Sequence, residues 1–259
     1  MTPSTRHCTL APVIANREVA PAIFEMRLRA SEIAAAAQPG QFVHLRVKSG
    51  LDPLLRRPLS IGAVEGEHIC LLFRVIGHGT QLLSRVVPGE TLDLLGPLGN
   101  PFTLHADRPA VLVAGGMGIA DMPLLARRLR EAGCPAIHLI FGARTAAELA
   151  WTDRVEAEGA QIHTATDDGS AGHHGVCTAL LPPLLREIDA RPAICACGPE
   201  PMFRAILSAV TDPAIPIQLA FEQRMGCGIG ACMACAVETS KGYLRACCEG
   251  PVLDGALLR

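Results

Sequence analysis

Aromatic side chains and long apolar runs are scarce in this sequence, and each scarcity excludes a class of protein. Aromatic residues make up only 3% of the 259 positions, which disfavours base stacking on nucleic acid. No uninterrupted apolar run is long enough for a membrane-spanning helix. The net charge of -2 provides no general basic surface for nucleic acid or an anionic membrane. We therefore expect neither nucleic acid nor a membrane among the partners.

The N-terminus lacks the apolar core of a secretory signal peptide, since Met1–Cys8 contains no apolar run. A chain without an export signal stays among reduced thiols, where cysteines serve as metal ligands, redox groups or packing. The 11 cysteines are then not expected to form a disulfide framework. The expected compartment is the cytoplasm.

Three cysteines near the C-terminus stand at a spacing typical of plant-type ferredoxins. Cys227, Cys232 and Cys235 form the pattern C-x4-C-x2-C, and a more distant cysteine, Cys247 or Cys248, completes a thiolate set for a 2Fe-2S cluster. The glycines among them allow the tight loop that converging thiolates need. Zinc more usually shows paired C-x2-C or Cys/His spacings, and buried free thiols are the remaining alternative. The spacing therefore favours an iron-sulfur cluster.

Short apolar segments separated by Pro/Gly turns extend from about residue 9 to residue 104. Their alternating pattern, with turns such as Pro39-Gly40 and Pro88-Gly89, predicts antiparallel strands that close into a small β-barrel. The predicted strands are Ile23–Leu28, Phe42–Val47, Ile69–Ile76 and Thr91–Leu95.

A continuous apolar run, Ala110–Ala114, is typical of a parallel strand that is buried on both faces. It leads into the glycine turn Gly115–Ile119 and a predicted helix through Arg130. A strand, a glycine turn and a helix N-terminus together form an anion-binding corner for a dinucleotide. Further strands alternate with helices, which predicts a doubly wound α/β domain. These strands are Ala136–Phe141, Ile162–Thr166 and Ala193–Cys197.

The order of these segments resembles the ferredoxin reductase superfamily. Arg57-Pro58-Leu59-Ser60, which alone is typical of a polar loop, is similar to the Arg-x-aromatic-Ser motif of its flavin domain, with Leu59 in the aromatic position. The resemblance implies an FAD site at Arg57, Pro58, Leu59, Ser60, Arg74, Val75, Ile76, Gly79 and Thr80. It also implies an NAD site, with a Cys-Gly-Pro segment beside the nicotinamide, at Gly115, Gly116, Gly118, Cys197, Gly198 and Pro199.

Within this superfamily the whole chain resembles the electron transfer subunits of type B dihydroorotate dehydrogenases. Phe221–Cys232 is close to the family motif Glu-x-Arg-Met-x-Cys-Gly-x-Gly-x-Cys. The fourth family ligand stands three residues before Gly-Pro-Val, a position that Cys247 occupies here. The implied metal ligands are Cys227, Cys232, Cys235 and Cys247, with Cys248 as the alternative to the last.

This resemblance implies an NAD-linked flavin and iron-sulfur oxidoreductase subunit of pyrimidine biosynthesis, with no catalytic residue of its own. Dihydroorotate would be oxidised at the FMN of a separate catalytic subunit, and two copies of each subunit would form a heterotetramer. Electrons would pass through the 2Fe-2S cluster and FAD to NAD+. The expected domains are an FAD-binding β-barrel at residues 1–105, an NAD-binding α/β domain at 106–220 and a 2Fe-2S segment at 221–259.

Two alternatives stay open at this stage. The chain could serve a ferredoxin:NAD(P), hydrogenase or sulfite reductase complex, although in the first of these an Asp commonly stands at the position of Cys227. It could also be a non-enzymatic ferredoxin-like carrier whose α/β domain binds no nucleotide. NADP is a further alternative to NAD, because Arg144 is placed to bind a 2′-phosphate.

Overall fold

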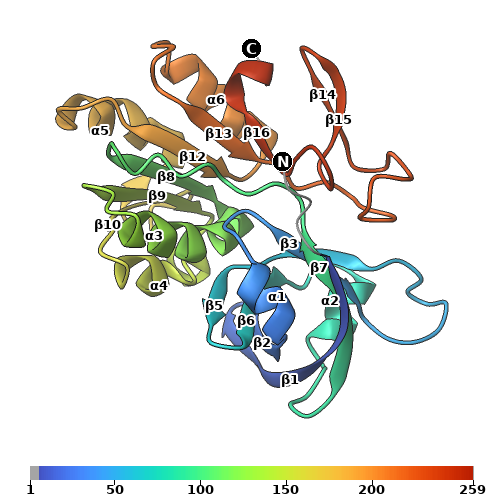
Figure 1. The fold of residues 1–259 in the computed structure, drawn as a ribbon. Helices are drawn as coiled ribbons and strands as arrows, with labels where there is room; N and C mark the ends of the chain where they lie inside the picture. The colour runs from blue at the N-terminus through green and yellow to red at the C-terminus, as the bar shows by residue number, and fades with distance from the viewer. Residues whose placement is uncertain (1–5, 259) are drawn as a thin grey trace.

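The structure, a computed structural model, describes residues 6–258 of the chain. Two seven-stranded sheets lie next to each other, and a two-stranded ribbon projects from the C-terminal part (Figure 1). The predicted fold class is confirmed, with an antiparallel half-barrel, a doubly wound α/β layer and a small C-terminal segment. Among residues 6–258, no helix is both long enough and apolar enough to cross a membrane.

The N-terminal sheet is a half-barrel with the strand order β4-β3-β7-β1-β2-β6-β5, and all its neighbours are antiparallel. Alternate residues, such as Met26 and Leu28, point into one apolar interior. Its elements are β1 (His7–Ala20), β2 (Ile23–Arg29), α1 (Ser31–Ala36), β3 (Phe42–Arg46), β4 (Arg57–Ser60), β5 (Ala63–Glu65), β6 (His68–Arg74), α2 (His78–Leu83) and β7 (Thr91–Leu98). All four predicted strands are confirmed, whereas β1 was not predicted because two register shifts break its alternation.

The second sheet has the order β11-β10-β9-β8-β12-β13-β16, and only the edge strand β16 is antiparallel to its neighbour. Leu112 in β8 packs toward α3 and the half-barrel, while Val113 packs toward α5 and α6, so both faces of the strand are buried. The strands are β8 (Ala110–Gly115), β9 (Ile137–Ala143), β10 (Gln161–Thr166), β11 (His173–His174), β12 (Ala193–Cys197), β13 (Ile217–Ala220) and β16 (Val252–Asp254). The helices are α3 (Met122–Glu131), α4 (Thr152–Glu156), α5 (Leu181–Glu187) and α6 (Glu200–Ala209).

The helix after the glycine turn begins later than the sequence predicts. A 3-10 segment, Gly116–Asp121, follows β8, and α3 starts only at Met122, where Pro123 suits the first turn. The backbone N–H of Leu124 then donates to the Gly62 carbonyl of the half-barrel at 2.9 Å. The N-terminus of α3 is therefore tied to the neighbouring sheet, and the 3-10 segment takes the place next to the glycine turn.

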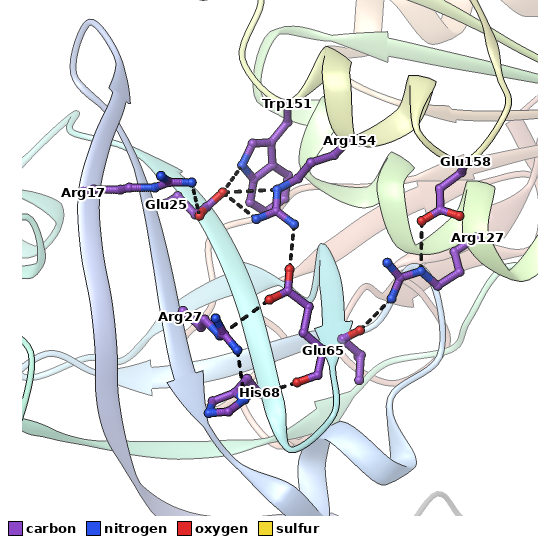
Figure 2. Close-up of polar contacts among 10 residues, drawn as sticks. Arg17, Glu25, Arg27, Glu65, His68, Arg127, Trp151, Arg154 and Glu158 are labelled. Atoms are coloured by element: carbon purple, nitrogen blue, oxygen red, sulfur yellow. Dashed lines mark hydrogen bonds and ion pairs between the residues drawn. The ribbon is translucent and has the colours of Figure 1, made fainter.

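A polar network joins the two sheets (Figure 2). Glu25 of β2 is only 6% exposed, and it accepts hydrogen bonds from Trp151 Nε1 at 2.6 Å and from Arg154 Nη2 at 2.9 Å. Arg154 also donates to Glu65 at 2.9 Å. Trp151 and Arg154 belong to the α/β domain, so these contacts fix it against the half-barrel.

The C-terminal segment carries the cysteine motif and then returns to the second sheet. Its ribbon consists of β14 (Ala236–Thr239) and β15 (Gly242–Arg245), which are antiparallel. After the ribbon, β16 pairs with β13. The Asn100 side chain donates to the Glu249 carbonyl at 2.8 Å, which ties the segment to the half-barrel as well. The domain boundaries proposed from the sequence stay predictions.

Candidate functional site

A cavity of about 1120 Å³ opens between the half-barrel, the α/β domain and the C-terminal segment. Its volume is slightly above the range of about 300–1,000 Å³ that is usual for small-molecule sites, which suits a dinucleotide-sized ligand. The residues predicted for cofactor binding that line it are Arg57, Pro58, Leu59, Ser60, Arg74, Ile76, Gly79, Thr80 and Cys197. Glu222 and neighbouring residues of the C-terminal segment line it too. Val75 lies outside this lining, and its N–H donates to Ala22 in the backbone.

The predicted flavin residues on two separate strands come together at Gly79. A Cβ atom on Gly79 would lie 2.3 Å from Nε of Arg57, so only glycine lets the guanidinium lie against this turn. The Thr80 hydroxyl oxygen accepts from the N–H groups of Ile76 at 3.0 Å and Gly77 at 3.2 Å, which fixes the turn. Leu59 offers an apolar side chain to the cavity in the position of the aromatic residue. The lining thus fits the diphosphate and ring of FAD.

Arg74 has a partner that the sequence did not reveal. Its guanidinium donates to both carboxylate oxygens of Glu148, at 3.0 and 2.9 Å, and Arg144 donates to the same carboxylate at 2.7 Å. The hydrogen bonds from Arg74 first, and then those from Arg144, lower the pKa of Glu148 to about 2. Arg74 therefore joins the flavin strand to the α/β domain, and the charge of Arg144 is already neutralised.

The two segments predicted to bind NAD pack against each other at the carboxyl ends of the adjacent strands β8 and β12. A Cβ atom on Gly118 would lie 1.9 Å from the carbonyl oxygen of Cys197, and one on Gly115 would lie 2.8 Å from Cδ of Pro199. Gly116 has a φ of +54°, a left-handed conformation that glycine adopts without strain. Open α/β sheets bind nucleotides at this edge, so the arrangement fits the nicotinamide half of NAD.

Gly118→Ala is expected to disable the nucleotide site while FAD and the iron-sulfur cluster are retained. The added Cβ would overlap the Cys197 carbonyl, and backbone cannot move aside cheaply. A misplacement of about 1 Å at a reacting centre can cost about 100-fold in rate, so reduction of the flavin by NADH should slow by roughly that factor. Stopped-flow spectroscopy measures this rate. The control, Gly133→Asn at the end of α3, adds a side chain where no atom lies within 4 Å, and normal reduction by Gly118→Ala would contradict the assignment.

The candidate cluster thiols form two pairs. The sulfur atoms of Cys235 and Cys247 are 3.3 Å apart, and the N–H of Cys227 donates to the sulfur of Cys232 at 3.4 Å. The Cys248 sulfur lies 3.8 Å from that of Cys247. Within residues 6–258, no three His, Cys, Asp or Glu side chains converge as a site for one metal ion. Two thiol pairs suit two irons with two thiolates each better than they suit a single zinc ion.

The loop around Cys227 favours the thiolate form that iron binding requires. The N–H groups of Ala231 and Ile229 donate to its sulfur at 3.2 and 3.5 Å. Desolvation raises the pKa of Cys227, but these donors and Cys232 outweigh it and lower the pKa to about 6. Burial and the neighbouring Cys235 raise the pKa of Cys247, so that thiol would deprotonate on metal binding.

His44 lies directly beneath the cysteine loop and was not assigned to any site from the sequence. Its side chain is fully buried, and both ring nitrogens lack a hydrogen-bond partner. Burial, and then the nearby Arg56, lower the pKa of His44 to about 4, so the imidazole is neutral. A Cβ on Gly228 would come within 2.5 Å of Nδ1, which shows how closely the loop covers the ring. No local sequence signal marks this contact, because it joins distant segments.

Cys247→Ser is expected to abolish the iron-sulfur cluster, whereas Cys248→Ser is expected to retain it. Cys247 is fully buried next to Cys235, while Cys248 is partly exposed and farther from that sulfur pair. Even changes outside the ligand shell commonly cost about 10–100-fold in metal affinity, so loss of a ligand should cost more. Iron and acid-labile sulfide analysis of both variants provides the comparison. A cluster that survives in Cys247→Ser and is lost in Cys248→Ser would reverse the assignment.

Comparison with known proteins supports an electron-transfer role. Residues 222–259 match the family profile of the iron-sulfur cluster binding domain of dihydroorotate dehydrogenase B. The electron transfer subunit of dihydroorotate dehydrogenase B (NAD(+)) from Geobacillus kaustophilus is 39% identical over 248 residues, which cover 93% of this chain and 94% of that protein. The corresponding subunit from Enterococcus faecalis is 38% identical over 94% of this chain and 95% of its own length.

Solved structures agree on the fold. A chain from the structure of an NADH-dependent reduced ferredoxin-NADP oxidoreductase superposes with a TM-score of 0.87 at 30% identity, over 97% of this chain and 90% of that one. The ferredoxin reductase of carbazole 1,9a-dioxygenase shares the fold with a TM-score of 0.70 at 21% identity, over 83% of this chain and 69% of that one. Together with the relatives at 38–39% identity over nearly the full length, these findings establish that the chain belongs to the family of dihydroorotate dehydrogenase B (NAD(+)) electron transfer subunits.

Proposed function

We propose that this chain accepts electrons from the FMN of a catalytic dihydroorotate dehydrogenase subunit and delivers them to NAD+, as a step of pyrimidine biosynthesis. The observation that carries the proposal is the shared cavity. Predicted FAD residues, the Cys197 turn and the segment just before Cys227 all line one space of about 1120 Å³. A ferredoxin-like carrier would not need such a cavity, so the second sheet does more than support the cysteine loop.

The chain's own residues bind and orient the redox groups. A 2Fe-2S cluster supplies single-electron transfer, and FAD pairs electrons into the hydride that NAD+ accepts. Arg57, with Gly79 beneath it, and Thr80 would hold the flavin diphosphate. Gly118 and Cys197 would position nicotinamide, and the ion pair of Arg74 with Glu148 would keep the two cofactor sites in register.

The catalytic partner follows from the absence of a pyrimidine site among the assigned residues. We infer a heterotetramer with two copies of each subunit, in which the cysteine loop faces the FMN subunit. Ile229 and Met233 lie in that loop with about half of their side chains exposed (48% and 49%), which suits burial against a protein partner. The reduced state of the free cysteines that the cluster requires places the complex in the cytoplasm.

NAD rather than NADP is the proposed acceptor. A 2′-phosphate needs an unpaired basic residue, and Arg144 already pairs with Glu148 at 2.7 Å. The same carboxylate is held by Arg74, so releasing Arg144 would leave Glu148 in place to repel a phosphate. This arrangement favours an acceptor without the extra phosphate.

The test of this function is reconstitution with a purified catalytic subunit. Dihydroorotate-dependent reduction of NAD+ should appear only when both proteins are present, and the complex should elute at the mass of two copies of each. NADP+ should be reduced more slowly. Reduction of NAD+ driven by reduced ferredoxin, and none driven by dihydroorotate, would instead favour the oxidoreductase-like alternative.

A further inference from the structure

Asp121 is a buried acid at the end of the 3-10 segment that the proposed function leaves without a role. The side chain is only 3% exposed, it lines the cavity, and its Oδ1 atom is buried without a hydrogen-bond partner. A buried polar atom without a partner is costly to the fold. In the wall of a ligand cavity, such an atom points to a partner that the ligand itself provides.

The neighbours of Asp121 come from both cofactor sites. Ser60 of β4 and Cys197 of β12 lie within hydrogen-bonding range of its carboxyl group. Glu222 lines the same cavity and is near enough for the two carboxylate charges to repel each other. Four polar side chains from four separate segments therefore meet where the flavin and nicotinamide residues approach each other.

These surroundings favour a bound proton. Burial raises the pKa of Asp121, and hydrogen bonds from Cys197 and Ser60 oppose the shift only in part. The protein around Glu222, and then the charge of Asp121, raise the pKa of Glu222 to about 6 although this side chain is accessible from the cavity. Two carboxyl groups this close resist double ionisation, so the pair holds a proton more readily than two isolated acids.

We propose that Asp121 is the proton-transfer residue of the flavin site and that Glu222 replaces its proton from the cavity. The proposal rests on the proposed function, because that function requires a proton. Two electrons arrive singly from the cluster, Asp121 gives one proton to the flavin, and one hydride leaves for NAD+, so charge and hydrogen balance. The O–H bond of Asp121 breaks, its carboxylate remains, and Glu222 then donates the next proton and recovers it from solvent.

The proposal is tested with Asp121→Asn, which keeps the shape of the side chain and removes the acidic proton. The orotate-linked formation of NADH should fall by about 100-fold, the low end of the range for general acid-base catalysis. Iron, sulfide and FAD contents should stay normal. Redox-difference infrared spectroscopy provides a readout independent of turnover, because a protonated carboxyl band that shifts in D2O should be present in the native protein and missing from the variant. Asp107→Asn, at an exposed position, is the matched control.

The outcomes separate this proposal from the function on which it rests. A variant that retains both the native rate and the carboxyl band would overturn the role of Asp121. If Asp121→Asn fails to bind FAD, the infrared measurement on the native protein decides alone, and a native spectrum without a redox-linked carboxyl band overturns the proposal. Native protein that binds no FAD would instead refute the proposed function.

Discussion

Replacement of Cys232 by Ala is expected to abolish dihydroorotate-linked reduction of NAD+ while NADH still reduces an artificial dye through the flavin. Cys232 lies in the exposed part of the cysteine loop, and its sulfur accepts the Cys227 N–H at 3.4 Å. Since even changes outside the ligand shell cost about 10–100-fold in metal affinity, loss of one thiolate should remove the cluster. The flavin cavity is formed by other residues and should be unaffected.

The two activities of Cys232→Ala are measured on the reconstituted complex. The orotate-linked rate should fall to background, and the NADH-to-dye rate should stay within about twofold of the native value, since surface changes away from a site are nearly neutral. Cys8→Ala, which removes an exposed thiol on β1, should preserve both rates. Loss of both activities together in Cys232→Ala would contradict the order in which electrons pass from cluster to flavin.

Replacement of Glu25 by Ala is expected to cause a large loss of stability. The substitution leaves Trp151 Nε1 and the Arg154 guanidinium without the buried carboxylate that both contact (Figure 2). Removal of one partner from a buried ion pair costs about 3–5 kcal/mol, and the lower end applies because Arg154 keeps Glu65. A loss of about 3 kcal/mol lowers the unfolding temperature of a chain of this size by roughly 6–12 °C. Thermal unfolding followed by circular dichroism measures the change.

The control for Glu25 is the exposed pair of Arg128 and Glu131 on α3, whose side chains are 35% and 47% exposed. Glu131→Ala should change stability by less than about 0.5 kcal/mol, because solvent screens such pairs. Equal destabilisation by the two substitutions would show that the Glu25 network does not hold the sheets together. Glu25→Ala should also slow hydride transfer, because the same network sets the flavin residues against the nucleotide turn.

The strands of both sheets were largely predictable, because alternation and continuous apolar runs are local properties. Leu112 and Val113 face opposite cores, as a run buried on both faces requires. The strand β1 escaped prediction because its register shifts interrupt the alternation. The late start of α3 escaped as well, since the bond from Leu124 to Gly62 depends on a neighbouring sheet.

The candidate site was predictable as a set of motifs but not as a set of contacts. The pattern of Cys227, Cys232 and Cys235 indicated the cluster, and Gly79 indicated a close approach that proved to involve Arg57. The partner of Arg74 could not be predicted, because Glu148 lies 74 residues away in the chain.

The buried acid and imidazole beside the site were equally inaccessible to sequence reasoning. Asp121 and His44 become isolated from water only when distant segments cover them. Burial of this kind depends on tertiary packing, and no spacing of residues in the sequence reports it.

The most direct measurement of the account is metal and flavin analysis of the anaerobically purified protein, followed by titration with NADH in the visible range. We expect about two irons, about two acid-labile sulfides and about one FAD per chain, with NADH bleaching both chromophores. This result would show that one chain connects NAD, flavin and cluster. Zinc in place of iron, with no flavin bound, would contradict the account and leave a structural metal segment on an α/β scaffold without an assigned task.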